Sequence, residues 1–290
     1  MATKLWLSKI GKVRIWERLL RERLSEPLHM NLMSLWVALF GSLRMKIYFD
    51  LLIRQHHAFA LLNAADKARG LGLRSVSVLE FGVASGTGLL NICEIARKVT
   101  RETGVGFKVY GFDTGTGMPA ARDHRDHPEH YRAGDFPMEK PDRLRALLPD
   151  DARLMIGNVA ETVPEFLGEL GTDSPIGFVS VDVDYYWSTV EALKILEGPA
   201  ACYLPTVTIY LDDVWFEEHN SWCGELGAAR DFNDAHALRK IERFNNLRSR
   251  RLFKKTQWID HMFTLHVLDH PRRNIGNTND GPRVLSNPYL

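Results

Sequence analysis

Four aspartates stand where two apolar runs of the sequence end. Asp182 and Asp184 follow the run 177–181, and Asp212 and Asp213 follow the run 206–211. If these runs are neighbouring parallel strands, their carboxyl ends meet at the edge where such sheets bind ligands. Carboxylates that close repel unless a cation or protons intervene, and oxygen ligands suit Mg²⁺ or Ca²⁺. The pattern predicts a divalent-cation site, with helix capping and loop anchoring as the alternative.

A glycine-rich segment follows another apolar run. The run 76–81 contains Glu80 and leads into three glycines spaced as E-x-G-V-x-x-G-x-G. Glycines here let the backbone turn sharply and approach a ligand, with a simple turn from strand to helix as the less favoured alternative. The run 108–112 ends at Asp113, where an acid can hydrogen-bond both hydroxyls of a ribose. Because the glycine spacing differs from the dinucleotide pattern G-x-G-x-x-G, we expect an adenosine-type cofactor other than NAD.

These motifs resemble those of a known family. The glycine loop resembles motif I of class I S-adenosylmethionine-dependent methyltransferases, in which the acid before the first glycine helps to hold the methionine ammonium group. V-D-x-D at 181–184 and D-D at 212–213 resemble the metal-binding arrangement of the cation-dependent branch, which includes the macrolide-sugar O-methyltransferases. The segment G-F-D-T-G-T-G-M-P at 111–119 is similar to the D-S-F-x-G-L-P segment of the sugar enzymes. Two departures, Val183 in place of glycine and a missing P-G-G turn within 199–205, leave the substrate class open.

The resemblance implies S-adenosylmethionine as cofactor, Mg²⁺, and O-methylation of a small hydroxylated acceptor such as a sugar, polyketide or catechol. By position it implies the metal ligands Asp182, Asp212 and Asp213, with Asp182 also placed as a base. His219 is a second candidate base, with an ordinary surface histidine as the alternative. The expected cofactor contacts are Glu80, Gly82, Ser85, Gly86, Gly88, Asp113 and Asn158. For Asn158, turn formation is the alternative. A metal-independent O- or N-methyltransferase and a non-catalytic cofactor-binding protein remain the alternative functions.

Three histidines, His124, His127 and His130, lie within ten residues and suggest a metal site. Pro128 would break a helix that aligned all three, and their spacing matches no known zinc pattern. A charged surface loop is therefore the favoured interpretation. Because this segment follows the strand that ends at Asp113, it is also a candidate substrate lid.

Short strand-like runs alternate with helical segments from residue 75 onward, which predicts an α/β fold with a doubly wound, Rossmann-like sheet. The resemblance implies seven strands, the last pair giving one antiparallel strand. The strands are expected at 76–81, 108–112, 153–156, 177–181 and 206–211, near 252–257, and at 261–268. The helices are expected at 88–100, 141–148, 161–170, 188–196 and 225–244. We divide the chain into an N-terminal helical extension (1–74), a methyltransferase domain (75–270) and a loose tail (271–290).

Composition limits the partners. With 37 basic and 36 acidic residues, the net charge of +1 argues against nucleic acid as a partner. Three cysteines without C-x-x-C spacing argue against a disulfide framework, so a reducing cytoplasm is expected. The sequence predicts no transmembrane span. Apolar and basic residues interleaved over 4–20 predict an amphipathic helix that packs on the domain or forms a homo-oligomer, with membrane-surface binding as the alternative.

Overall fold

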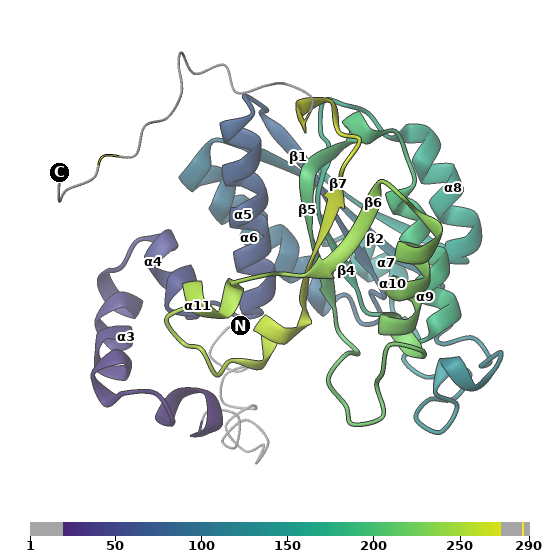
Figure 1. The fold of residues 1–290 in the computed structure, drawn as a ribbon, viewed down its shortest axis with the longest axis horizontal. Helices are drawn as coiled ribbons and strands as arrows, with labels where there is room; N and C mark the ends of the chain where they lie inside the picture. Colours follow the sequence, from purple (N-terminus) through teal and green to yellow (C-terminus); the bar gives the residue numbers. More distant parts are fainter. Residues whose placement is uncertain (1–19, 274–285, 287–290) are drawn as a thin grey trace.

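The computed structural model describes residues 20–273 and Ser286, and in this part of the chain seven strands form one sheet. The strand order is β3-β2-β1-β4-β5-β7-β6 (Figure 1). Only β7 runs antiparallel to its neighbours, β5 and β6. The strands are β1 (Ser75–Phe81), β2 (Gly106–Asp113), β3 (Ala152–Ile156), β4 (Ile176–Val181), β5 (Tyr203–Leu211), β6 (Arg239–Arg243) and β7 (Met262–Val267).

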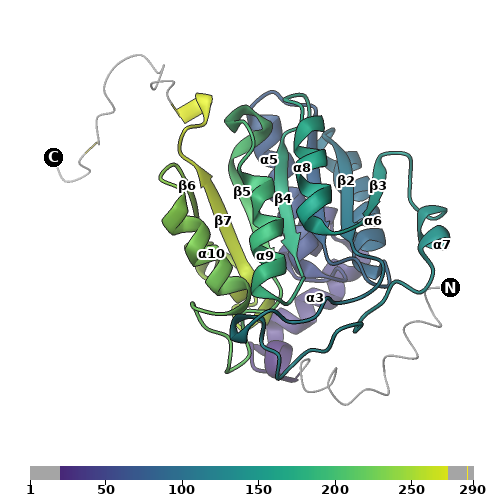
Figure 2. The ribbon, with the colours of Figure 1, turned by 90° about the vertical axis from the view of Figure 1, so that its right-hand side faces the viewer.

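Helices cover both faces of the sheet. The α-helices are α3 (Leu28–Phe40), α4 (Leu43–Tyr48), α5 (Gln55–Gly70), α6 (Thr87–Thr103), α7 (Pro141–Arg145), α8 (Val159–Glu169), α9 (Tyr186–Leu193), α10 (Gly224–Ala235) and α11 (Leu247–Arg250). Helices α5 and α6 lie on one face, and α8, α9 and α10 lie on the other (Figure 2). This is the doubly wound α/β arrangement that the sequence predicted.

Two hydrophobic cores lie on the two faces. Leu61 of α5 and Leu89 of α6 pack with Val78 of β1 in one core, and Phe166 of α8 packs with Val179 of β4 in the other. Every residue of β4 is buried. A strand covered on both faces needs a continuous apolar run rather than an alternating one, which explains why the central strands were evident in the sequence.

The predicted positions of the first five strands and of the last strand are confirmed. The strand predicted near 252–257 is wrong, because β6 lies at Arg239–Arg243, inside the helix predicted at 225–244. That helix ends at Ala235 instead. The charged residues of β6 are helix formers, but Ile241 pairs with Leu265 of β7 and is buried, so tertiary pairing overrides propensity. Phe253 packs into a separate small core instead of a strand.

The N-terminal extension is tied to a late part of the chain. Its helix α5 packs on β1, β4 and β5, and α3 and α4 precede it. The Arg251 guanidinium donates to the Asp50 carboxylate at 2.5 Å and to the carbonyl oxygen of Ile47 at 2.6 Å, and both charged side chains are buried. A buried ion pair broken on one side leaves an uncompensated charge, so this contact fixes the extension in place. The boundary at residue 74 between the N-terminal extension and the following domain stays a prediction.

Among the described helices, none is both long and apolar enough to cross a bilayer. The amphipathic segment predicted over 4–20 lies outside the described residues except for Leu20, which begins a short π-helical turn, Leu20–Leu24. Most of the tail predicted at 271–290 also lies outside them; the described part includes a 3₁₀ turn at Pro271–Arg273.

Candidate active site

The sheet reverses its strand order between β1 and β4. Open parallel sheets bind ligands in the crevice beyond the carboxyl ends of their strands at such a reversal. Gly82 directly follows β1, and Asp182 directly follows β4. The structure therefore brings the glycine loop and the acidic residues together, although they are about a hundred positions apart in the sequence.

The three glycines after β1 are required for different reasons. Gly82 and Gly86 have φ angles of +85° and +80°, which other residues rarely adopt. A Cβ atom on Gly82 would lie 1.7 Å from the backbone carbonyl oxygen of Asp182. One on Gly88 would lie 2.0 Å from Oε1 of Glu80. The loop thus passes directly against the backbone that follows β4, and α6 begins directly over the Glu80 carboxyl group.

The Glu80 carboxyl group is buried, and its Oε2 atom has no hydrogen-bond partner among the described residues. Burial raises the pKa of Glu80 to about 8, and the positive charge of Arg54 opposes this rise. A buried carboxylate without a partner is costly, so this position fits a ligand that brings a cation, such as an ammonium group.

Asp113 is placed at the end of β2 as predicted, but its carboxylate also holds the glycine loop. Oδ2 accepts from the backbone N–H groups of Val83 at 2.9 Å and Ala84 at 2.7 Å. Oδ1 accepts from the N–H of Gly115 at 2.6 Å. Asp113 lines a cavity of about 420 Å³ together with Gly82. Since a carboxylate oxygen accepts more than one hydrogen bond, contact with a ribose is compatible with this clamping role.

Asp182, Asp212 and Asp213 form an acidic rim at this crevice. Each offers one carboxylate oxygen, and these three atoms lie within 4.8 Å of one another. Burial raises the pKa of Asp182, and the charges of Asp212 and Asp213 raise it further. Burial also raises the pKa of Asp213, to about 9, and Asp184 adds to the rise. Oxygen ligands that repel one another at this spacing fit a hard divalent cation.

Other side chains hold the rim in position. Tyr210 donates its hydroxyl proton to Oδ1 of Asp212 at 2.5 Å, and Tyr131 donates to Oδ1 of Asp213 at 3.1 Å. Beneath the rim, the buried Glu225 accepts from the backbone N–H of Asp213 at 3.0 Å. The sequence analysis missed Glu225, because an acid in the first turn of a helix has an ordinary explanation in the helix dipole.

The rim lies between two cavities. The 420 Å³ cavity extends from the glycine loop, and a second cavity of about 660 Å³ lies between α5, α6 and the segment before β7. Asp212, Asp213 and Phe216 line both. A small molecule in each cavity would therefore meet the other at the acidic rim, the arrangement that group transfer between two ligands requires.

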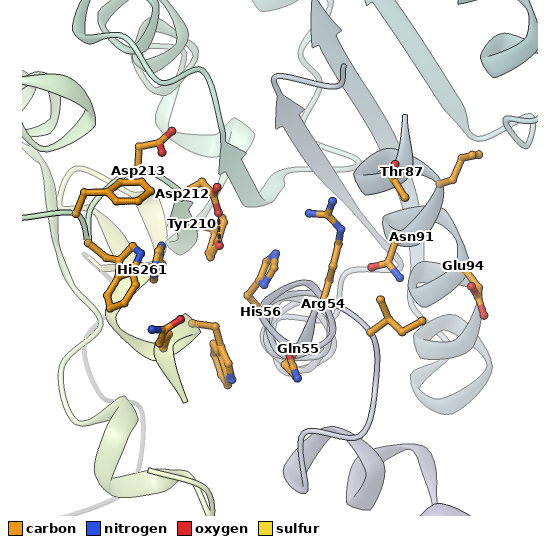
Figure 3. A pocket seen from close by; sticks show the side chains of 16 residues that line it. Arg54, Gln55, His56, Thr87, Asn91, Glu94, Tyr210, Asp212, Asp213 and His261 are labelled. Carbon is orange, nitrogen blue, oxygen red and sulfur yellow. Dashed lines mark hydrogen bonds between the residues drawn. The ribbon is translucent and has the colours of Figure 1, made fainter. Parts of the chain in front are cut away.

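Two residues of the larger cavity were missed in the sequence. Arg54 directly precedes α5 and has a φ angle of +54°, and its guanidinium points into the space between His56 and Asn91 (Figure 3). His261 donates from Nδ1 to the carbonyl oxygen of Leu211 at 3.0 Å, which leaves Nε2 as the acceptor in the neutral ring. Neither residue lies in a recognisable motif, and both reach the cavity only through tertiary packing.

Three of the predicted residues take part in other contacts. Ser85 is exposed and contacts the Thr87 hydroxyl at 2.7 Å. Asn158 caps α8 by accepting from the N–H of Ala160 at 3.0 Å, the turn-forming role given as its alternative. His219 packs against the ring of His127 with the centroids 4.9 Å apart. The structure thus brings Glu80, Gly82, Gly86, Gly88, Asp113, Asp182, Asp212 and Asp213 together, and it places these three residues around them.

Comparison with known proteins gives matches only at the level of structure. No protein-family model matches the sequence, and no curated protein matches it. Among solved structures, the calicheamicin methyltransferase CalS11 is similar over 63% of this chain and 74% of its own, at 23% identity and a TM-score of 0.46. The O-methyltransferase NovP is similar over 54% of this chain and 64% of its own, at 19% identity and a TM-score of 0.39. TomG, an O-methyltransferase from Streptomyces achromogenes, is similar over 79% of this chain and 92% of its own, at 12% identity and a TM-score of 0.41.

The sheet itself defines the fold. Its strand order is 3-2-1-4-5-7-6, and its seven strands, the antiparallel β7 and the helices on both faces are the features that the resemblance had led us to expect. This chain has the fold of the class I S-adenosylmethionine-dependent methyltransferases.

Proposed function

We propose that the chain is an S-adenosylmethionine-dependent O-methyltransferase that acts on a small hydroxylated acceptor with the help of a divalent cation. One observation carries the proposal. The Glu80 glycine loop, which suits the cofactor, meets the three carboxylates of the acidic rim at the reversal point of the sheet. A nucleotide-binding protein would need only the first feature, whereas transfer to a hydroxyl group uses both.

For the cofactor, opposite charges stand where the amino-acid end of S-adenosylmethionine would need them. Glu80 suits its ammonium group, and Arg54, whose charge acts on Glu80, suits its carboxylate. Asp113 and Gly82 line the adjoining cavity of about 420 Å³, where the ribose would lie. We therefore add Arg54 to the cofactor-binding residues proposed from the sequence.

For the acceptor, the cavity of about 660 Å³ is large enough to hold a small molecule beside the amino-acid end of the cofactor, which would reach Arg54 in its wall. When bound, S-adenosylmethionine supplies the methyl group, and a cation held by Asp182, Asp212 and Asp213 lowers the pKa of the acceptor hydroxyl. Asp182 is the proposed proton acceptor. His261 lines the same cavity and is a further candidate base, better positioned than His219, which lines neither of the two cavities. Phe216 lines both cavities and would contact both ligands.

The N-terminal extension supports a homo-oligomer. Helix α3 exposes large apolar side chains, among them Leu35 at 66%, Trp36 at 58% and Leu39 at 74% exposure. A continuous apolar surface of this kind on a soluble chain is typical of an interface. We propose that a second copy of the chain covers it.

The proposal is tested first by binding and then by turnover. Calorimetric titration should detect S-adenosylhomocysteine and no NAD; NAD binding without S-adenosylhomocysteine binding would contradict the cofactor assignment. Methyl transfer from labelled S-adenosylmethionine to a panel of sugars, polyketides and catechols should stop in chelator and return with Mg²⁺. Transfer that continues in excess chelator would favour a metal-independent enzyme. Cofactor binding with no transfer to the panel would favour the non-catalytic alternative.

A further inference from the structure

Two loops meet beside the 420 Å³ cavity and bring a group of imidazoles and carboxylates together. The loop after β2 contributes His127, Glu129 and His130, and the loop after β5 contributes Glu218 and His219. This group is separate in composition from the acidic rim, which offers only carboxylates. It also includes two of the three histidines for which the sequence favoured a surface loop.

The donor atoms of the first loop are close enough to share one ion. His127, Glu129 and His130 each offer an atom within 4.8 Å of the other two. Nδ1 of His127 lies 3.1 Å from Oε1 of Glu129, and Nε2 of His130 lies 4.0 Å from that oxygen. Ligand atoms on a tetrahedral Zn²⁺ are about 3.3 Å apart, from metal–nitrogen distances of about 2.0 Å. The His127–Glu129 distance is within a few tenths of an ångström of that value, and the His130–Glu129 distance would have to shorten by about 0.7 Å for both atoms to bind one ion.

The His127 ring is held rigidly. Its φ angle of +51° is unusual for a residue with a side chain, and the tight turn is closed by the bond from His130 N–H to the His127 carbonyl at 2.9 Å. The ring is only 3% exposed; its Nδ1 atom is at hydrogen-bond distance from Glu129, and its Nε2 atom, on the opposite edge of the ring, has no hydrogen-bond partner among the described residues. Gly224 leaves room for it, because a Cβ there would lie 3.2 Å from Nε2. A buried polar side chain in a strained turn is typical of a functional site rather than of an ordinary surface loop.

The second loop faces these residues. Oε2 of Glu218 lies 3.8 Å from Nε2 of His130. The His219 ring lies 4.9 Å from that of His127 and 6.3 Å from that of His130, measured between centroids. Both ring nitrogens of His219 are buried without a hydrogen bond of normal geometry, and the Asp213 backbone is only a weak contact. An additional ligand from this loop is thus within reach.

We propose that His127, Glu129 and His130 form a second metal site, for a borderline cation such as Zn²⁺, and that Glu218 or His219 completes it. Imidazole nitrogens with one or two carboxylates are the ligand set that Zn²⁺ prefers, whereas Mg²⁺ prefers oxygen alone. The ion joins the two loops that carry Tyr131 and Phe216, and both of these residues line the 420 Å³ cavity. It therefore closes the cavity by a bond between loops rather than by chemistry on the substrate.

The test uses the full chain, freed of metal by chelator and dialysed, and titrated with Co²⁺ as a spectroscopic substitute for Zn²⁺. The background variant Asp212→Asn weakens binding at the acidic rim. In it we expect one equivalent of Co²⁺ with the intense visible absorption of tetrahedral, nitrogen-containing coordination, and displacement by Zn²⁺. His130→Ala should weaken this binding by about tenfold or more, since even the loss of an outer-shell partner costs that much. His124→Ala is the matched control, because His124 is an exposed histidine of the same loop.

Two results would overturn the proposal. One is a Co²⁺ titration that is the same in His130→Ala and His124→Ala. The other is the absence of a tetrahedral spectrum in the Asp212→Asn background. Because His130 is partly exposed, its variant should fold, which circular dichroism checks. The bridge between loops is tested by the double variant Glu218→Gln/His219→Ala: weaker Co²⁺ binding supports it, and unchanged binding rules it out.

Discussion

The backbone carbonyl oxygen of Asp182 lies 1.7 Å from the point where a side chain on Gly82 would place its Cβ atom. The cofactor loop and the acidic rim are therefore packed backbone against backbone, with no room for a side chain between them. In a close-packed interior such a contact transmits displacement directly.

Replacing Gly82 by alanine should destabilise the protein and weaken S-adenosylhomocysteine binding together. The backbone clash and the φ angle of +85° should cost at least about 2 kcal/mol of unfolding free energy. Gly72→Ala is the matched control, because Gly72 has a φ angle of +73° but no atom within 4 Å of its Cβ position. Urea unfolding and calorimetry measure both effects. If Gly82→Ala and Gly72→Ala lose equal free energy of unfolding, the backbone around Gly82 adjusts so that no clash with Asp182 occurs.

Glu80→Gln should stabilise the ligand-free protein increasingly as pH rises. The folded pKa of Glu80 is about 8, above its ordinary value of about 4.5, so the native state holds a proton that the unfolded state loses in this window. Below pH about 4.5, burial of Glu80 does not lower the free energy of unfolding of the wild type. Between pH about 4.5 and about 8 the loss grows by at most about 1.4 kcal/mol per pH unit, and above pH about 8 it is complete. The difference in urea midpoint between variant and wild type, measured at pH about 5 and about 8.5, checks this. A difference that does not change with pH would contradict it.

Arg54→Ala should weaken S-adenosylhomocysteine binding by about 1.5–3 kcal/mol while leaving adenosine binding unchanged. The proposed contact is with the carboxylate of the amino-acid end, which adenosine lacks. Asp113→Ala provides the contrast, since it should weaken both ligands. Calorimetric titration of the two ligands against the two variants gives the answer. Equal losses for both ligands in Arg54→Ala would assign that residue a general structural role instead.

Mg²⁺ should raise the melting temperature of the wild-type protein and have a much smaller effect on Asp212→Asn. Three carboxylates within 4.8 Å repel one another, and a cation that binds only the folded state stabilises it. For turnover, Asp182→Asn should cost more than Asp212→Asn, because loss of a general base alone costs about 10²–10⁴ in rate. Thermal unfolding across a Mg²⁺ series measures the first effect. If Mg²⁺ raises the melting temperature of Asp212→Asn as much as that of the wild type, the cation binds at another site.

The double variant Trp36→Glu/Leu39→Glu should reduce the sedimentation coefficient if α3 joins two copies of the chain. Charged side chains in the centre of an apolar interface disrupt it, while S-adenosylhomocysteine binding should persist because α3 lines neither of the two cavities. Leu147→Glu is the control, since Leu147 is 59% exposed on a different part of the surface. If the wild type already sediments as a monomer, the proposed oligomer is wrong.

Sequence reasoning succeeded where one physical pattern dominated. The continuous apolar runs of β1 and β4 are typical of strands that are buried on both faces. Since Gly82 and Asp182 directly follow these runs, the sequence predicted that both lie at the ligand-binding edge of the sheet. It failed where long-range pairing decided the outcome. The charged segment Arg239–Arg243 became a strand only because β7 lies beside it. Arg54 and Glu225 reach the site from helices that carry no motif, so only the packed structure identifies them.

The buried pair of Asp50 and Arg251 also has a consequence for how the chain is made. The two residues are 201 positions apart, so the helices around Asp50 leave the ribosome long before their partner exists. Until Arg251 emerges, a buried acid and the apolar side chains around it have no complete site to enter. The helices around Asp50 thus complete their folding only after Arg251 has been made, and in that interval they are a target for chaperones and proteases.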